Sequence, residues 1–299
     1  MNRWVKRILI GLGVVAGVLL IALGALVGYG EAAFGRTYER DLYPIEADTS
    51  PEGVARGEYL VKHVVACSGC HAERLGGPLT GRVEEVAIGP MRMTLVFPNL
   101  TPDEETGLGS WSDAEIARAI REGLDREGRE LYIMPSQQLR VLSDADVAAI
   151  VGYLRTLEPV RNPLPPLSAN ALAKPMLAMH LMVPGAVSEP ITEAQVAPEP
   201  GTVEYGEYLV WLGLCRDCHG QTLQGNKLPT PDALYAPNLT SSGNPGGWTE
   251  EQFIQTLRFG RTPEGRLLDP EQMHWPLYGQ MSDDDLGAIL QYLQSLPAE

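Results

Sequence analysis

The chain has 299 residues, of which 44% are apolar and 20% are charged, so it is predicted to be folded and long enough for two domains. Its formal net charge is −15, and the only three charged residues before position 8 are basic, so the remainder is more acidic still. A surface of this sign argues against nucleic acid as a partner and favours a cationic protein.

The first thirty residues are predicted to be a membrane anchor. Three basic residues precede an uncharged run from Ile8 to Tyr29, whose length matches the roughly 20 residues that cross a bilayer as a helix. Basic residues at the N-terminal side keep that end in the cytoplasm. The alternative is a cleaved signal peptide, whose apolar region is shorter, about 7–15 residues, and is followed by a small-residue cleavage site. We expect residues 1–30 to be retained in the cytoplasmic membrane as a single-pass helix, with everything after Gly30 on the periplasmic side.

Residues 31–54 carry two prolines and no sustained period, and are expected to be a tether. The first domain is assigned to residues 55–158. Apolar and aromatic side chains recur at helical spacing between Gly57 and Ala66, which predicts an amphipathic helix leading into a cysteine. Residues 76–98 are expected to be rich in loops and to wrap the edge of a cofactor held by that cysteine.

Residues 67 to 71 read Cys-Ser-Gly-Cys-His, and residues 215 to 219 read Cys-Arg-Asp-Cys-His. In each, two thiols one helical turn apart can reach both vinyl groups on one edge of a porphyrin, and the next histidine can coordinate the iron. The pattern C-x-x-C-H is the signature of a c-type haem attachment site. We therefore predict two covalently attached haem c groups, held by Cys67, Cys70 and His71 and by Cys215, Cys218 and His219.

Three other roles for these cysteines fit the sequence less well than haem attachment: a zinc site, a redox dithiol and two disulfides. Zinc ribbons place their C-x-x-C pairs about 15–20 residues apart, far closer than Cys67 and Cys215. A thioredoxin-like dithiol needs a βαβ context, and no strand-like run leads into either site. Two disulfides would leave the histidine after each pair unexplained.

Two helix starts follow in the first domain. Ser112 and Glu115 form a capping box, and Ser143 begins the last helix. Between these helices stands Met134, followed by Pro135. A methionine in such a loop is ordinarily core filler, but a repeat in the second half makes Met134 a candidate sixth iron ligand.

The second half, residues 204–299, restates the first in order. The repeated segments are 57–61 with 206–210, 67–71 with 215–219, 98–101 with 237–240, 127–129 with 264–266, and the last helix start, 143 with 282. Aligning those last two serines places Met134 on Met273, each nine residues before the last helix.

Met273 is therefore predicted to be the sixth ligand of the second haem. His274 is the main alternative and would give a bis-histidine haem of lower potential. Met281 is a weaker one, because it aligns with Leu142. The iron ligands are thus predicted to be His71, Met134, His219 and Met273.

Three further pairs recur in both halves, and two roles remain open for them: contacts to a propionate or an iron ligand, or helix capping and packing. They are Asn99 with Asn238, Trp111 with Trp248, and Arg129 with Arg266. His63 is expected on a helix face or beside a propionate.

Residues 159–203 form a Pro-rich bridge between the halves. Its apolar middle, residues 176–182, is expected to pack across one haem domain or between the two. His180 within it is expected to be structural, with a ligand switch as the alternative.

The arrangement N-L-T-P-D, G-x-G-x-W-S-D, M-P and L-S-D-x-D, preceded by C-x-x-C-H, resembles the multihaem cytochrome c subunits of membrane-bound alcohol and sugar dehydrogenases. The resemblance covers about residues 55–299. It implies an all-α fold of two tandem class I cytochrome c domains, here preceded by one transmembrane helix. Those subunits typically carry three haem domains, and the loop at 102–106 is reshaped at 241–247 in the second half.

The expected function is relay of single electrons between respiratory or photosynthetic partners at the outer face of the membrane. Expected partners are a dehydrogenase, a cytochrome bc complex, an oxidase or reaction centre, or a basic soluble cytochrome. The alternative is a dihaem enzyme, such as a peroxidase or a sulfur-compound dehydrogenase, with one labile haem. No spare cysteine exists to ligate such a haem.

Overall fold

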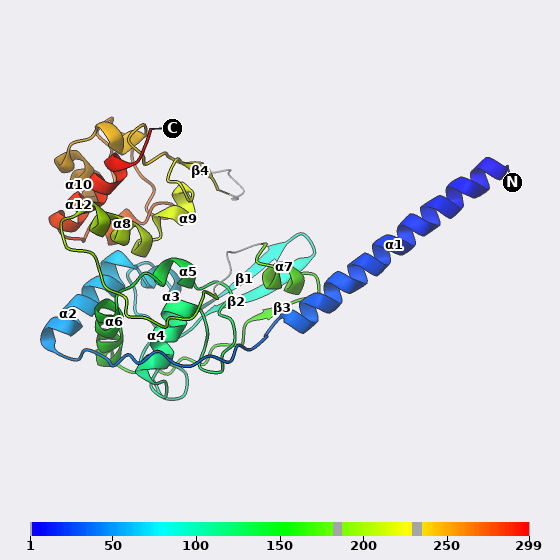
Figure 1. Ribbon diagram of the computed structural model, residues 1–299, viewed down its shortest axis with the longest axis horizontal. Helices are drawn as coiled ribbons and strands as arrows, with labels where there is room; N and C mark the ends of the chain where they lie inside the picture. The colour runs from blue at the N-terminus through cyan, green and yellow to red at the C-terminus, as the bar shows by residue number, and fades with distance from the viewer. Residues whose placement is uncertain (1, 182–186, 229–234, 299) are drawn as a thin grey trace.

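The computed structural model describes residues 2–181, 187–228 and 235–298. One long helix, α1 (Arg3–Ala33), projects from two helical halves that lie side by side (Figure 1). Within the described residues α1 alone is long and apolar enough to cross a membrane, and none of its most apolar window is buried against the protein. The criteria are length and composition, and a signal sequence also meets them.

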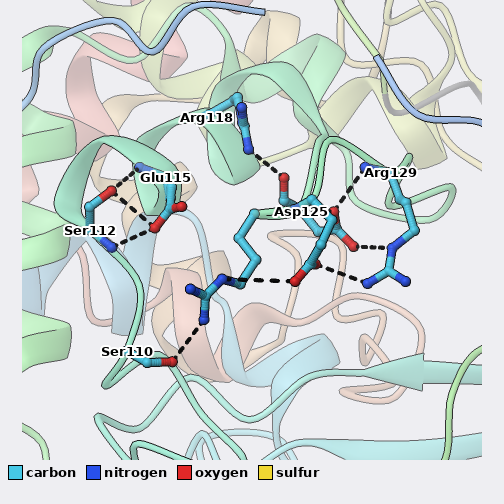
Figure 2. A network of polar contacts seen from close by, with 8 residues as sticks. Ser110, Ser112, Glu115, Arg118, Asp125 and Arg129 are labelled. Atoms are coloured by element: carbon cyan, nitrogen blue, oxygen red, sulfur yellow. Dashed lines mark hydrogen bonds and ion pairs between the residues drawn. The ribbon is translucent and has the colours of Figure 1, made fainter. Parts of the chain in front are cut away.

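The first half begins with α2 (Pro51–Tyr59), which runs directly into a π-helical turn, η1 (Leu60–Val64). Ser50 caps α2, and Pro51 occupies the first position, where a missing N–H costs nothing. The predicted capping box of Ser112 and Glu115 is present (Figure 2). The remaining helices of this half are α3 (Ser68–His71), α4 (Asp113–Glu122), α5 (Ser136–Leu139) and α6 (Asp144–Thr156).

The second half repeats this order of helices. Thr249 and Gln252 form the equivalent capping box. Its elements are α8 (Val203–Leu212), α9 (Cys215–His219), β4 (Asn226–Lys227), β5 (Tyr235–Ala236), η2 (Asn244–Gly247), α10 (Glu250–Phe259), α11 (Trp275–Tyr278) and α12 (Asp283–Ser295).

In each half the first and last helices cross at a glycine. A Cβ at Gly57 would overlap the carbonyl oxygen of Ala149 in α6, and a Cβ at Gly206 would overlap that of Ala288 in α12. The two helix axes can approach so closely only because the side chain is absent. Each attachment motif follows the first helix of its half. The crossing therefore fixes the position of the motif relative to the last helix in the same way in both halves.

The expected loop at residues 76–98 is wrong over most of its length. Residues 82–97 form an antiparallel hairpin of β1 (Arg82–Ile88) and β2 (Met91–Phe97), in register from Arg82 opposite Phe97 to Ile88 opposite Met91. Two runs rich in Val, Ile, Thr and Phe flank a Gly-Pro dipeptide, and this pattern is typical of a β-hairpin. The prediction of a loop gave this pattern too little weight. The fold is therefore mostly helical rather than all-α.

The bridge adds a third strand, β3 (Ser168–Ala169), to β2 and then a short helix, α7 (Lys174–Ala178). Leu177 of α7 is 1% exposed and packs with Met93 and Tyr132 in a small second core. The apolar middle of the bridge thus packs on the hairpin of the first half and on the end of α1, not between the halves. Its last residue, Met182, lies outside the described residues.

The two halves meet through a reciprocal pair of contacts, which we call the joint. Tyr59 Oη donates to Asp285 Oδ2 at 2.6 Å and accepts from the Ser282 amide at 2.9 Å. In the other direction, Tyr208 Oη donates to Asp146 Oδ2 at 2.6 Å and accepts from the Ser143 amide at 3.1 Å. In each direction a tyrosine of one half's first helix binds the start of the other half's last helix. Hydrophobic side chains of both halves form one continuous core around these contacts.

Replacing Tyr208 with phenylalanine is expected to destabilise the protein by about 2 kcal/mol, because a hydrogen bond to a charged acceptor is lost and the Asp146 carboxylate stays buried. Tyr59→Phe is expected to cost less, since Tyr59 is less buried. Urea unfolding of the purified protein measures both. Tyr235→Phe, at a side chain 65% exposed, is the matched control; equal midpoints for all three variants would contradict a stabilising joint.

Candidate functional site

Both C-x-x-C-H motifs form a single helical turn that starts from a strained residue. Ala66, just before Cys67, has φ = 57°, and Leu214, just before Cys215, has φ = 55°. Non-glycine residues adopt this left-handed region at a cost of about 1 kcal/mol or more. The reversal turns the chain out of the first helix, and each short helix then carries its two thiols one turn apart.

The histidine that ends each motif is oriented by a backbone carbonyl. His71 Nδ1 lies 2.8 Å from the Pro98 oxygen, and His219 Nδ1 lies 2.8 Å from the Pro237 oxygen. A carbonyl oxygen only accepts, so Nδ1 carries the proton and Nε2 keeps its lone pair free for a metal. Burial lowers the pKa of both imidazoles, which favours the neutral form that ligation requires.

Cys67, Cys215 and Cys218 are partly buried. Burial raises the pKa of Cys67 and of Cys215 to about 12, and raises those of Cys70 and Cys218 as well. Among the residues that the structure describes, no three His, Cys, Asp or Glu side chains gather as a metal cluster.

A cavity of about 440 Å³ occupies the second half, within the 300–1,000 Å³ of ligand pockets. Its wall is mainly apolar, formed by side chains of α8, α10 and α12. The motif residues Cys215, Cys218 and His219 line it, and so do Met273, His274 and Met281. An apolar space bounded by two thiols and an oriented imidazole fits a covalently attached haem.

Met134 and Met273 occupy equivalent turns. The amide two residues later donates to the methionine carbonyl in both, from Ser136 at 2.8 Å and from Trp275 at 2.6 Å. Both methionines are partly buried against the core. Sequence alignment and backbone geometry thus agree on the pairing, while Met281, which is 2% exposed, lines the same cavity as Met273.

The imidazole of His274 lies close to the first half. A Cβ at Gly69, inside the first motif, would lie 4.0 Å from two ring atoms of His274. His274 also lines the cavity of the second half together with Met273, so the choice between these two residues as the ligand stays a prediction.

Of the other repeated residues, the asparagines cap turns. Asn99 Oδ1 accepts from the Thr101 amide at 3.0 Å, and Asn238 Oδ1 from the Thr240 amide at 2.7 Å. Arg129 pairs with Asp125 on the surface (Figure 2). Arg266 and Trp248, in contrast, line the cavity of the second half, where contact with a propionate stays open to them.

The two remaining histidines lie elsewhere. His180 Nε2 lies 2.8 Å from Glu130 Oε1, which favours its structural role. Burial lowers the pKa of His63, which lies beside the backbone of Leu277 in the second half.

The second attachment motif is held by side chains from both halves. Gln138 of the first half donates to Asp217, the residue before Cys218. Tyr278 Oη donates to the carbonyl of Gly213, just before the second motif, at 2.9 Å. Burial first, and then the thiols of Cys215, Cys218 and Cys70, raise the pKa of Tyr278. Sequence reasoning missed all of this, because none of these side chains belongs to a repeated motif.

Residues 54–158, which include the first attachment motif, match the family profile described as Cytochrome c. This part of the chain belongs to the cytochrome c family. The match includes the first attachment motif and Met134, and the class I cytochrome c fold is mostly helical, as found here.

Three curated relatives extend the likeness over most of the chain. The cytochrome c subunit of alcohol dehydrogenase (quinone) from Gluconobacter oxydans is 30% identical over 92% of this chain and 60% of its own length. The gluconate 2-dehydrogenase cytochrome c subunit from Pantoea cypripedii is 30% identical over 82% of the chain and 60% of its own length. A diheme cytochrome c-type protein from Cereibacter sphaeroides is 29% identical over 78% of the chain and 82% of its own length.

The resemblance expected from the motifs is thus confirmed. This chain spans about 60% of the length of the two dehydrogenase subunits. A cytochrome c domain implies covalently bound haem c, and its relatives transfer electrons as cytochrome c subunits of dehydrogenases.

Proposed function

We propose that the chain is a membrane-anchored dihaem cytochrome c, with a second cytochrome c domain over residues 204–299. It passes single electrons between redox partners at the outer face of the cytoplasmic membrane. The observation that carries the proposal is the pair of C-x-x-C-H turns, one in each half, each with its histidine oriented by a backbone carbonyl. A relative of similar length named as diheme supports the count of two.

Each haem would supply an iron that changes its charge by one electron. The thiols of Cys67 and Cys70, and of Cys215 and Cys218, would fix one edge of each porphyrin. His71 and His219 would present Nε2 to one face, with Nδ1–H held by a carbonyl. Met134 and Met273 would present a thioether to the other face, and histidine–methionine ligation raises the potential.

The two attachment motifs are close enough to support a relay. A Cβ at Gly69, in the first motif, would lie 4.0 Å from ring atoms of His274 in the second half, and Gln138 of the first half donates to Asp217 in the second motif. Haem groups held by the two motifs would be neighbours, and exchange of single electrons is the chemistry that they would supply.

The anchor part of the proposal rests on α1. Its uncharged run has the length of a bilayer core, and its basic N-terminal residues favour retention on the cytoplasmic side. The haem-bearing halves would then lie on the periplasmic side, held through residues 31–54.

The donor we propose is a dehydrogenase, because the names of several relatives place them in such enzymes. For the acceptor we retain a cytochrome bc complex, an oxidase, a reaction centre or a basic soluble cytochrome. The net charge of −15 favours a cationic surface on the partner. Faster reduction or oxidation at low ionic strength would support this preference.

Two measurements on the full chain in detergent test the function. A pyridine haemochrome assay is expected to give two haem c groups per polypeptide, and a potentiometric titration with optical and EPR detection to give two low-spin centres. One haem per chain, or a high-spin centre that binds peroxide, would overturn the dihaem relay and favour the enzyme alternative.

Replacing Met273 with alanine is expected to lower the potential of one centre and to open its sixth site. The thioether favours the ferrous state, and its loss removes that preference. Met134→Ala is expected to do the same at the other centre. His274→Ala is the matched control and should leave both centres six-coordinate. If instead His274→Ala converted a low-spin signal into a high-spin one, His274 would be the ligand.

A further inference from the structure

We infer that α7 and its flanks form a second membrane contact: the exposed side chains of Leu172, Met179 and Leu181 enter the headgroup layer of the bilayer beside α1. The inference rests on the proposed role of α1 as an anchor. It gives a purpose to α7 and to the length of the hairpin, because the equivalent strands of the second half, β4 and β5, are only two residues long in the described part of the chain.

The first observation is that α7 is packed against the end of α1 (Figure 1). A Cβ at Gly30 would lie 2.5 Å from Pro175, so the absence of a side chain lets α7 pack tightly against the helix. Lys174 Nζ pairs with Glu31 Oε2 at 2.5 Å. These contacts set the distance of α7 from the bilayer once α1 spans it.

The second observation is the height of this contact along α1. Gly30 directly follows Tyr29, the last residue of the uncharged run. One helical turn rises about 5.4 Å, and the headgroup layer on each side of a bilayer core is roughly 5–7 Å thick. A segment packed at Gly30 therefore lies at the level of the headgroups.

The third observation is the amphipathic division of residues 172–181. Ala173, Pro175 and Leu177 are buried against the hairpin and α1. In the residues that flank α7, the apolar side chains are exposed: Leu172 is 38% exposed, Met179 44% and Leu181 61%. Exposed apolar side chains at this height are stabilised by lipid rather than by water.

The fourth observation is that the segment is held in place. β3 pairs with β2, the Asn170 amide donates to the Arg92 carbonyl at 2.9 Å, and the Asn170 side chain donates to the Pro90 carbonyl at 2.9 Å. The end of α1 is fixed as well, because Phe34 stacks on Tyr132 with ring centroids 5.3 Å apart. The exposed residues that flank α7 are thus held in position relative to α1.

Charge agrees with lipid as the occupant. Arg36, three residues after α1, and Arg92, at the hairpin end, are both exposed. The Arg92 carbonyl accepts from the Asn170 amide, so Arg92 lies beside the segment, and Arg36 follows the helix that the segment packs on. Positive side chains at these places suit lipid phosphates, in a chain whose net charge is strongly negative. A soluble protein docking on the same side chains would have to fit between them and the membrane surface.

Photolabelling of the full chain in phosphatidylcholine nanodiscs tests the inference. A fraction of the lipid carries a diazirine on its acyl chain close to the headgroup, and mass spectrometry locates the adducts. We expect adducts in α1 and in residues 172–181. Adducts in α1 alone would overturn the second contact while leaving the anchor in place. If α1 itself stayed unlabelled, the anchor proposal would fail and this inference with it.

The double variant Met179→Glu/Leu181→Glu sharpens the test. Adducts in residues 172–181 are expected to fall by about tenfold, the factor that corresponds to loss of one buried leucine side chain, while those in α1 stay constant. Val196→Glu, at a side chain 85% exposed in the bridge, is the matched control. An unchanged haem content shows that each variant is folded. Undiminished labelling of residues 172–181 in the double variant would also overturn the inference.

Discussion

A variant with Cys215 and Cys218 both replaced by alanine is expected to carry one haem per chain instead of two. Without thiols, no covalent bond holds a porphyrin in the second cavity, and His219 alone cannot retain one through purification. The first motif, built from other residues, should load normally. The haemochrome assay and the intact mass, which should fall by one haem and two sulfur atoms, measure the result.

The reciprocal variant, Cys67→Ala/Cys70→Ala, is the control for this experiment. It should lose the other haem and leave the centre with His219 and Met273 as its ligands. Each variant should therefore show a single reduction potential, and the two potentials should differ. The sum of the two absorption spectra should resemble the spectrum of the parent protein. Two haems retained in either variant would contradict the assignment of the motifs.

Replacing Gly57 or Gly206 with alanine is expected to destabilise the protein by about 3 kcal/mol each. The new Cβ would overlap a carbonyl oxygen of the last helix, and backbone atoms cannot move aside as a side chain can. The helices must separate, which also shifts the attachment motif that follows the first helix. Urea unfolding of the holoprotein measures the loss, and the haem content reports whether attachment survives.

Gly247→Ala is the matched control, because a Cβ there meets nothing within 4 Å. Its unfolding midpoint should equal that of the parent within error. If Gly57→Ala and Gly206→Ala behaved like this control, the close crossing of the first and last helices would not be a constraint on the fold.

Much of the helical framework was predictable because its signals are local. The serine and threonine caps at positions 112, 143, 249 and 282 mark helix starts that the structure reproduces. Each depends on a side chain reaching an amide three residues ahead, so sequence alone contains the information.

The hairpin and the joint show where such reasoning stops. Strands β1 and β2 carry a local signal, which was outweighed by the expectation that this stretch wraps a haem. The joint has no local signal, because Tyr59 and Asp285 are brought together only by the packing of complete halves. The predicted ligands Met134 and Met273 are an intermediate case. Aligning the two halves of the sequence pairs these methionines, whereas coordination of an iron by either one depends on the bound cofactor.

The joint has a consequence for the origin of the molecule. Its contacts, from Tyr59 to Asp285 and from Tyr208 to Asp146, are related as they would be by a two-fold rotation axis. Surfaces that complement themselves in this way are what symmetric homodimers use. The two halves therefore have the geometry of a dimer whose subunits became fused by the bridge, and we expect either half, expressed alone with its haem, to pair with a second copy of itself.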